Sequence, residues 1–417
     1  MSSVGVRLRV ERLDEDGFGV AKGIRIPYTL PGELVEVKST FRKRRKRFAR
    51  EFTVLEESPR RVPPRCPHFG ICGGCRLQHM SYDDQLAFKR EKLRRILGVD
   101  VDVLPSPRIF GHRNRIDVVI TPDGVGFRRF GTWWSVFDLN ECPVFGPRAA
   151  EAVSALRAFM EDHDLKPYDL RTHEGFLRYI VLREGKNTGE FMVSLVTTAG
   201  ELPDPTDYFE VDSIYHLIND TLSDVSFGEP RRFWGKEFIT ERLLDVEYLI
   251  HPNSFFQTNT YQAERLVSLV AEYVDGSRIL DLYSGVGTFS IYLAKRGISA
   301  HGIDINEFSI ELARRNAELN GVSELVSYEV KFDSDVSHLA GYDTIILDPP
   351  RAGLHPHLSK RLLSDGPGRI LYVSCNPKTF KQDLDILSER YRLSSIVGLD
   401  MFPHTPHVEL FSVLERR

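Results

Sequence analysis

The chain has 417 residues, of which 41% are hydrophobic and 27% are charged, and its formal net charge is −4. This length predicts two or three domains, and this balance excludes a wholly disordered or collagen-like chain. No run approaches the ~18 consecutive apolar residues of a membrane-spanning helix, and the N-terminus lacks the apolar core of a signal peptide, so we expect a soluble cytoplasmic protein.

Residues 4–57 alternate apolar and polar side chains in short stretches broken by Gly and Pro, which predicts a small β-barrel of four or five strands. Positive charge is concentrated here: residues 1–65 contain 16 Lys and Arg against 9 Asp and Glu, whereas the rest contains 39 basic and 50 acidic residues. The densest run is RKRRKR, residues 42–47. Such a run is usually a solvated loop, and it predicts a phosphate-binding face only within a nucleic-acid-binding module.

The segment RRVPPRCP, with three prolines, predicts a linker after a first domain of residues 1–57. Residues 82–97 have the apolar spacing of an amphipathic helix, and residues 110–245 are mostly strand-like, with one helix around AAEAVSALRAFME. We therefore expect a central α+β region over residues 58–250. From Tyr261, helices alternate with buried strands, which predicts a doubly wound, Rossmann-like α/β domain over residues 251–417.

Three strand ends in this last domain carry features suited to a bound cofactor. The sequence DLYSGVGT follows one strand and opens a helix, Asp304 ends the next strand about 20 residues later, and DPPR follows a third. A Gly-rich turn alone is weak evidence, because only Gly285 and Gly287 fit the dinucleotide fingerprint. Together, the three strand ends resemble an S-adenosylmethionine-dependent methyltransferase.

Two further residues are candidates for chemistry. Cys375 directly follows the strand RILYVS, and its neighbours Ser374, Asn376 and Pro377 are polar or turn-forming, which argues against a cysteine that merely fills a core. Glu409 begins the closing strand, in MFPHTPHVELF, where a glutamate is normally solvated. The sequence alone does not select Glu409.

The motifs SFFQTN, DLYSGVGTF, DPPR, SCNP and FPHTPHVE occur in this order and resemble the RNA uracil-5-methyltransferase family over most of the chain. The resemblance implies Cys375 as nucleophile, Glu409 as general base and Phe255 near the target base. It also implies four residues around the methyl donor: Gln257, Tyr283, Asp304 and Asp348. Lys331 stands where many relatives have Asn or Asp near the adenine, and Asp333 is a possible substitute.

This pairing of residue types suits the chemistry. C5 of uracil is a weak nucleophile, so a thiolate adds to C6 and makes an enolate whose C5 attacks the methyl group. A carboxylate then removes the C5 proton so that the thiolate can leave, and the nucleotide has to be flipped out of its stack. Methylation of an amino group, on another base or a protein, needs no thiol. A non-catalytic RNA-binding or iron–sulfur sensor protein would have no reason to keep both residues.

The other four cysteines form a pattern typical of a metal centre: Cys66, Cys72 and Cys75 lie within ten residues, and 66 residues separate Cys75 from Cys142. Spacing fits zinc or an iron–sulfur cluster. The segment GGCRLQHMSYDDQL resembles the iron–sulfur segment of the same family, which implies a structural [4Fe–4S] cluster. Likewise, the N-terminal barrel resembles a TRAM domain, so the implied partner is RNA, either tRNA or 23S rRNA. We infer no obligate protein partner.

Overall fold

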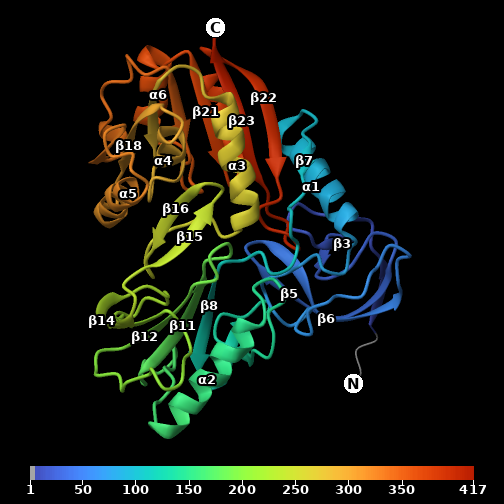
Figure 1. Ribbon diagram of the computed structural model, residues 1–417. Helices are drawn as coiled ribbons and strands as arrows, with labels where there is room; N and C mark the ends of the chain where they lie inside the picture. Colours follow the sequence, from blue (N-terminus) through green and yellow to red (C-terminus); the bar gives the residue numbers. More distant parts are fainter. Residues whose placement is uncertain (1–4) are drawn as a thin grey trace.

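The computed structural model describes residues 5–417, which form sheets of six, seven and eight strands and one separate two-stranded hairpin (Figure 1). The six-stranded sheet is the predicted N-terminal barrel, with strand order β1-β5-β6-β4-β3-β2 around a small core that includes Leu8, Ile26 and Val35. Val4, where the strand pattern begins, lies outside the described residues. The strands are β1 Val6–Arg9, β2 Arg12–Leu13, β3 Gly19–Ala21, β4 Ile24–Ile26, β5 Leu34–Lys43 and β6 Lys46–Glu56.

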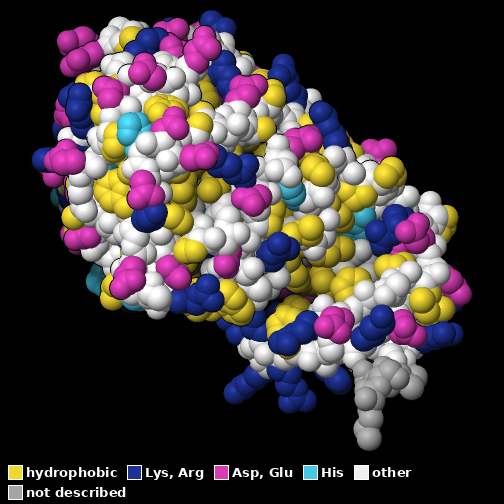
Figure 2. Space-filling model, turned by 90° about the horizontal axis from the view of Figure 1, so that it is seen from below, with side chains coloured by type: hydrophobic (Ala, Val, Ile, Leu, Met, Phe, Trp, Pro, Cys, Tyr) yellow, Lys and Arg dark blue, Asp and Glu magenta, His cyan; other side chains and the backbone are white. Residues whose placement is uncertain are grey.

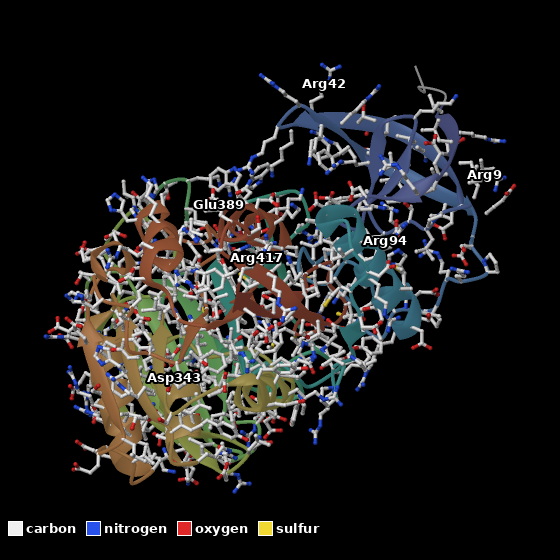
Figure 3. All side chains as sticks on the ribbon, turned by 90° about the horizontal axis from the view of Figure 1, so that it is seen from above. Arg9, Arg42, Arg94, Asp343, Glu389 and Arg417 are labelled. Atoms are coloured by element: carbon white, nitrogen blue, oxygen red, sulfur yellow. The ribbon has the colours of Figure 1, made fainter. Side chains whose placement is uncertain are left out.

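The basic run, residues 42–47, forms the tip of the β5–β6 hairpin. All six side chains of the basic run are exposed, and the backbones of Arg44 and Arg45 have positive φ angles in the turn. Arg42 lies at the end of this hairpin, well away from the C-terminal domain (Figure 3). The sequence therefore places its highest charge density where repulsion is relieved by solvent.

Helix α1 (Tyr82–Leu97) has the predicted bounds because both of its ends are well capped. The Ser81 side chain accepts a hydrogen bond from the Asp84 backbone N–H, and Gly98 ends the helix in a left-handed conformation. Acidic residues in the first turn and basic residues in the last turn favour the helix dipole. The buried face of α1 packs through Leu86 and Leu93 onto the C-terminal domain.

The central sheet has the strand order β10-β9-β8-β11-β12-β13-β14, and helix α2 (Arg148–Asp162) packs on one face. Its order and composition confirm the mixed α+β region. β14 was not predicted because it is an exposed edge strand of polar sequence. The strands are β8 Arg115–Thr121, β9 Gly124–Arg128, β10 Val136–Asp138, β11 Leu177–Glu184, β12 Phe191–Thr197, β13 Ser213–Ile218 and β14 Glu229–Gly235. A hairpin, β15 Ile239–Leu243 with β16 Val246–Ile250, follows.

The eight-stranded sheet confirms the doubly wound α/β domain. Its order is β19-β18-β17-β20-β21-β23-β22-β7, with α3, α4 and α5 on one face and α1, α6 and α7 on the other (Figure 1). The strands are β7 Val103–Leu104, β17 Arg278–Leu282, β18 Ser299–Asp304, β19 Val326–Val330, β20 Thr344–Leu347, β21 Arg369–Ser374, β22 Tyr391–Leu399 and β23 Glu409–Arg416. The helices are α3 Thr260–Tyr273, α4 Thr288–Ala294, α5 Glu307–Leu319, α6 Pro356–Asp365 and α7 Pro377–Leu387, and Asp333–Asp335 forms a 3-10 turn.

Strand order reverses at β17, which pairs in parallel with β18 on one side and β20 on the other. In such sheets, ligands bind outside the carboxyl ends of the strands at this reversal. The division at residue 250 stays a prediction; strand β7, from the predicted central segment, pairs with β22 in the C-terminal sheet. Among residues 5–417, none of the helices has the length and apolarity to cross a bilayer.

Candidate active site

The Asp304 carboxylate connects the segments that follow β17 and β18. Its two oxygens accept hydrogen bonds of 2.9 Å from the backbone N–H groups of Gly285 and Asn306. Gly287 begins α4 with φ +84°, and a Cβ there would lie 2.5 Å from the hydroxyl oxygen of Tyr328. The Gly-rich turn thus needs glycine at Gly287 both for its backbone conformation and for its packing.

A cavity of about 1440 Å³ opens over these strand ends. It is lined by all seven residues that the sequence associated with catalysis, the methyl donor and the target base: Phe255, Gln257, Tyr283, Asp304, Asp348, Cys375 and Glu409. The fold thus brings together residues from six segments that are up to about 150 positions apart in sequence.

Strand pairing places Cys375 next to Glu409. β21 and β23 are antiparallel with Ser374 opposite Leu410, so Cys375, one residue later, lies beside Glu409, one residue earlier. Burial, then the nearby carboxyls of Glu409 and Asp348, raise the pKa of the Cys375 thiol to about 11. The thiol is therefore protonated at neutral pH before a substrate is bound.

Two buried carboxyl groups, those of Asp348 and Glu409, line the cavity. Burial raises the pKa of Asp348 to about 7, and burial together with the Asp348 carboxylate raises the pKa of Glu409 well above its usual range. Gln257 Nε2 donates a hydrogen bond of 3.3 Å to Asp348 Oδ2. At neutral pH, like charges at this depth keep at least one of the two carboxyl groups protonated.

Tyr283 and Lys331, which the resemblance placed near the methyl donor, each contact an acidic side chain. The Tyr283 hydroxyl donates to Asp333 Oδ2 at 2.6 Å, whereas Lys331 Nζ pairs with Glu329 Oε1 at 3.0 Å. Both Lys331 and Asp333 line the cavity. Asp333, and not Lys331, is thus hydrogen-bonded to Tyr283.

The loop that leads to Glu409 is held by helix α1, a role that sequence reasoning missed. Lys89 and Asp400 form a fully buried ion pair, and Lys89 Nζ also donates to the Phe402 carbonyl at 3.1 Å. Gln85 Oε1 accepts from the His404 N–H at 2.9 Å. The available signal was a lysine on the apolar face of the helix, between Leu86 and Leu93.

Arg183 holds the segment SFFQTN in the same way, and was also missed. Its buried guanidinium donates to the carbonyls of His251 and Ser254 and, at 3.2 Å, to Ser254 Oγ. This leaves the next residue, Phe255, 65% exposed at the cavity. An arginine within the apolar strand RYIVLRE was the signal.

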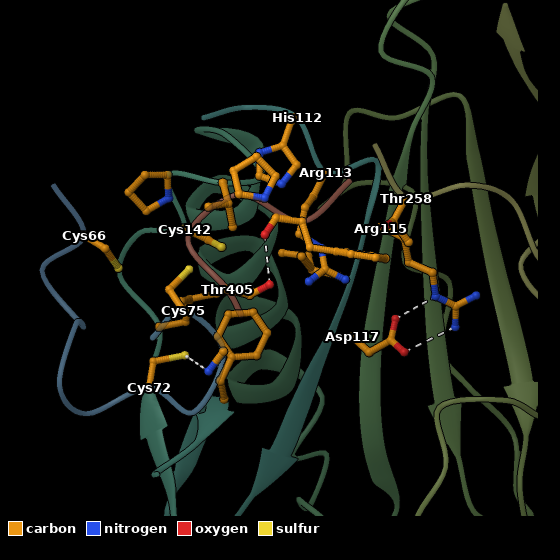
Figure 4. Close-up of a pocket in the computed structure, with 18 of the residues that line it drawn as sticks. Cys66, Cys72, Cys75, His112, Arg113, Arg115, Asp117, Cys142, Thr258 and Thr405 are labelled. Carbon is orange, nitrogen blue, oxygen red and sulfur yellow. Dashed lines mark hydrogen bonds and ion pairs between the residues drawn. The ribbon is translucent and has the colours of Figure 1, made fainter. Parts of the chain in front are cut away.

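The four remaining cysteines line a second cavity of about 530 Å³ (Figure 4). Burial raises the pKa of Cys75 to about 12 and that of Cys142 to about 11. Phe255 and Phe402 line both cavities. This cysteine cavity therefore adjoins the cavity over the strand ends, which contains Cys375 and Glu409 and is called the active cavity below. Within residues 5–417, no group of three or more His, Cys, Asp or Glu side chains is arranged to hold a metal ion.

The chain matches two models of known protein families. Residues 231–417 match the family model of tRNA (uracil-5-)-methyltransferase, and residues 6–60 match that of the TRAM domain of tRNA (uracil(54)-C(5))-methyltransferase. The chain is 58% identical over 405 residues to the tRNA (uracil(54)-C(5))-methyltransferase of Pyrococcus abyssi, covering 97% of this chain and 99% of the relative.

Two other comparisons extend the picture. The chain is 40% identical over 421 residues to the 23S rRNA (uracil(747)-C(5))-methyltransferase of Pyrococcus horikoshii, covering 99% of this chain and 100% of the relative. Its fold is similar to the crystal structure of the Pyrococcus abyssi tRNA (uracil-54, C5)-methyltransferase in complex with S-adenosyl-L-homocysteine. For that structure the TM-score is 0.92 and the identity 56%, covering 98% of this chain and 99% of the other.

Proposed function

The chain belongs to the RNA uracil-C5-methyltransferase family, and from this premise we propose that it transfers a methyl group from S-adenosylmethionine to C5 of uridine 54 in tRNA. Sequence identity favours tRNA as the substrate, because the chain is 58% identical to a tRNA (uracil(54)-C(5))-methyltransferase and 40% identical to a 23S rRNA (uracil(747)-C(5))-methyltransferase. The single observation that carries the chemistry is that Cys375 and the buried Glu409 lie next to each other on neighbouring strands and line one cavity.

In this proposal, the Cys375 thiol loses its proton to solvent, and the thiolate adds to C6 of the uracil. As the sulfur–carbon bond forms, the C5–C6 π electrons move onto C5 and the neighbouring carbonyl as an enolate. S-adenosylmethionine supplies an electrophilic methyl group when it is bound. After methylation, Glu409 takes the proton from C5, and the electrons of that C–H bond restore the C5–C6 double bond and expel the Cys375 thiolate. The raised pKa of Glu409 makes it a stronger base once it is ionised.

The cavity's residues fit a methyl donor. Gln257, Tyr283, Asp304 and Asp348 would hold it, and two exposed apolar side chains, Ile305 and Phe332, would contact its adenine. Phe255 is the stacking surface for the target base.

The choice of RNA is tested by following labelled methyl groups into two RNAs. We expect an unmodified tRNA transcript to be methylated at U54, and the same transcript with U54 changed to C to take up no label. A 23S rRNA fragment containing U747 should be methylated with a kcat/KM at least tenfold lower. Equal or faster methylation of the 23S fragment would contradict the assignment to tRNA.

The basic run would contact RNA phosphates in this proposal. It is exposed on a domain that matches a TRAM model, and Arg42, Lys43, Arg44 and Arg45 make no ion pair with the residues described. On the face shown in Figure 2, Lys and Arg side chains project from the lower edge of the molecule. Unpaired arginines of this kind are suited to phosphates.

The four cysteines would hold a [4Fe–4S] cluster through their thiolates. What supports this is the donor set, four thiols around one cavity. The cluster's role is structural, since methyl transfer includes no redox step.

We expect protein purified without oxygen to contain about four iron atoms and four inorganic sulfides per chain, with no zinc. A Cys142→Ser variant should lose iron, whereas Cys375→Ser should keep it, because Cys375 lies in the other cavity. Zinc without iron or sulfide in the anaerobic protein would overturn the cluster assignment.

A further inference from the structure

We propose that the turn between β9 and β10 (residues 129–135, the tryptophan turn) binds an unpaired nucleotide of the RNA substrate by stacking its base on Trp133 or Trp134. The inference rests on the proposed function, because it presumes an RNA substrate. It adds a second contact for that RNA, outside the cavity that holds the target uridine.

The tryptophan turn presents two large aromatic side chains to solvent. Trp133 is 59% exposed and Trp134 is 43% exposed, and their rings meet edge to face with centroids 5.7 Å apart. Indole is costly to leave in water, and neighbouring exposed aromatic rings mark interaction sites. The two rings differ in orientation by 79°, so each offers its own flat face.

The turn is held in place by its backbone and by one arginine. Arg128 Nε donates to the Trp133 carbonyl at 2.9 Å, and its Nη2 reaches Tyr179 at 3.1 Å and Asp224 at 2.5 Å. The Arg129 N–H donates to the Ser135 carbonyl at 2.9 Å. Because the indoles stay exposed on an anchored turn, binding a base there costs little ordering of the protein.

The turn touches both the RNA-binding barrel and the wall of the active cavity. On one side, Phe130 packs against Phe18 and Tyr28 of the barrel, with centroids 5.8 and 5.5 Å apart. On the other, Arg128 is paired with Asp224, in the loop of residues 219–228 whose Val225 and Phe227 line the active cavity. The tryptophan turn therefore lies between the two parts of the protein that a bound RNA has to contact.

Charge identifies the occupant as nucleic acid. Arg129, in the tryptophan turn, is exposed and forms no ion pair in the part of the chain described. Through Phe18, the turn is linked to Phe48, which follows the basic run directly. Aromatic rings among unpaired arginines bind single-stranded RNA by stacking and by phosphate contacts, with little dependence on the base.

The test uses the full-length protein with both tryptophans changed. We expect Trp133→Ala with Trp134→Ala to raise the Kd for tRNA about tenfold, the loss expected for one stacked base, while kcat at saturating tRNA stays within twofold. The matched control, Trp133→Phe with Trp134→Phe, retains flat rings and should bind nearly as tightly as the wild type. Unchanged tRNA affinity in the alanine variant would overturn the inference.

Salt dependence separates stacking from charge. Changing Arg42, Lys43, Arg44 and Arg45 to Gln should flatten the slope of log K against log salt, by about 0.7 per lost phosphate contact, whereas the double alanine variant should keep the wild-type slope. If the wild type methylates no RNA, the proposed function fails. Suppose instead that the wild type methylates tRNA, that the alanine variant binds tRNA as tightly as the wild type, and that only the wild type self-associates at high concentration. The turn then binds a second copy of the protein, and the inference is wrong.

Discussion

Replacing Cys375 with alanine should lower methylation of tRNA by at least ~10⁴-fold, because no other group can activate C5 of the uracil. Cys375 is the one cysteine that lines the active cavity, and the alanine leaves only a small space where the thiol was. The measurement is transfer of labelled methyl groups at saturating substrates. Denaturing electrophoresis with RNA containing 5-fluorouridine at position 54 should show a covalent adduct with the wild type and none with the variant.

Binding of the methyl donor is the control for this substitution. S-adenosylhomocysteine should bind the Cys375→Ala variant with an affinity close to that of the wild type, since Gln257, Asp304 and Asp348 are unchanged. Loss of that binding would mean that the substitution disturbed the cavity. An adduct that persists in the alanine variant would rule out Cys375 as the nucleophile.

Replacing Glu409 with glutamine should stop the reaction after methyl transfer. The amide cannot accept the C5 proton, so Cys375 cannot be expelled, and turnover should fall roughly 10²–10⁴-fold. The variant should accumulate an adduct between RNA and protein that carries the labelled methyl group and survives denaturing electrophoresis. The fold should tolerate the change, because glutamine has the same shape and removes an ionisable group that is fully buried.

Asp348→Asn is the matched control for Glu409→Gln, since it removes the other buried carboxyl group of the same cavity. It should slow methylation without accumulating a methylated adduct, because Glu409 is still present to take the proton. Normal turnover by Glu409→Gln, or a methylated adduct with Asp348→Asn instead, would show that the general base is a different residue.

The sequence was most informative where local pattern and chemistry coincide. Helix α1 was predicted with its observed bounds from its apolar spacing alone, and the structure adds that Ser81 and Gly98 cap its two ends. The strands that end at Asp304, Asp348 and Cys375 are short apolar runs followed by polar residues, so the shared edge of the sheet could be anticipated. Glu409 could be chosen only through the family resemblance, because its burial comes from pairing with β21.

What could not be predicted depends on contacts between distant segments. Lys89 and Arg183 look like surface residues in sequence, yet their partners lie 311 and 68 to 71 positions away. Strand β22 was missed because Arg392, Ser394 and Ser395 interrupt its apolar pattern, and its pairing with β23 is irregular at this point. Whether a charged side chain is buried, and whether an irregular segment forms a strand, depends on tertiary contacts that a short stretch of sequence does not contain.

The position of β23 has a consequence for synthesis of the protein. This strand is the last of the sheet to leave the ribosome, yet it is inserted between β21 and β22, which are both made earlier. Until it emerges, the nascent chain exposes two unpaired strand edges, and Cys375 has no glutamate beside it. Every strand and helix that binds the methyl donor is therefore complete before the nucleophile can meet its base, so an unfinished chain cannot complete a turnover on RNA.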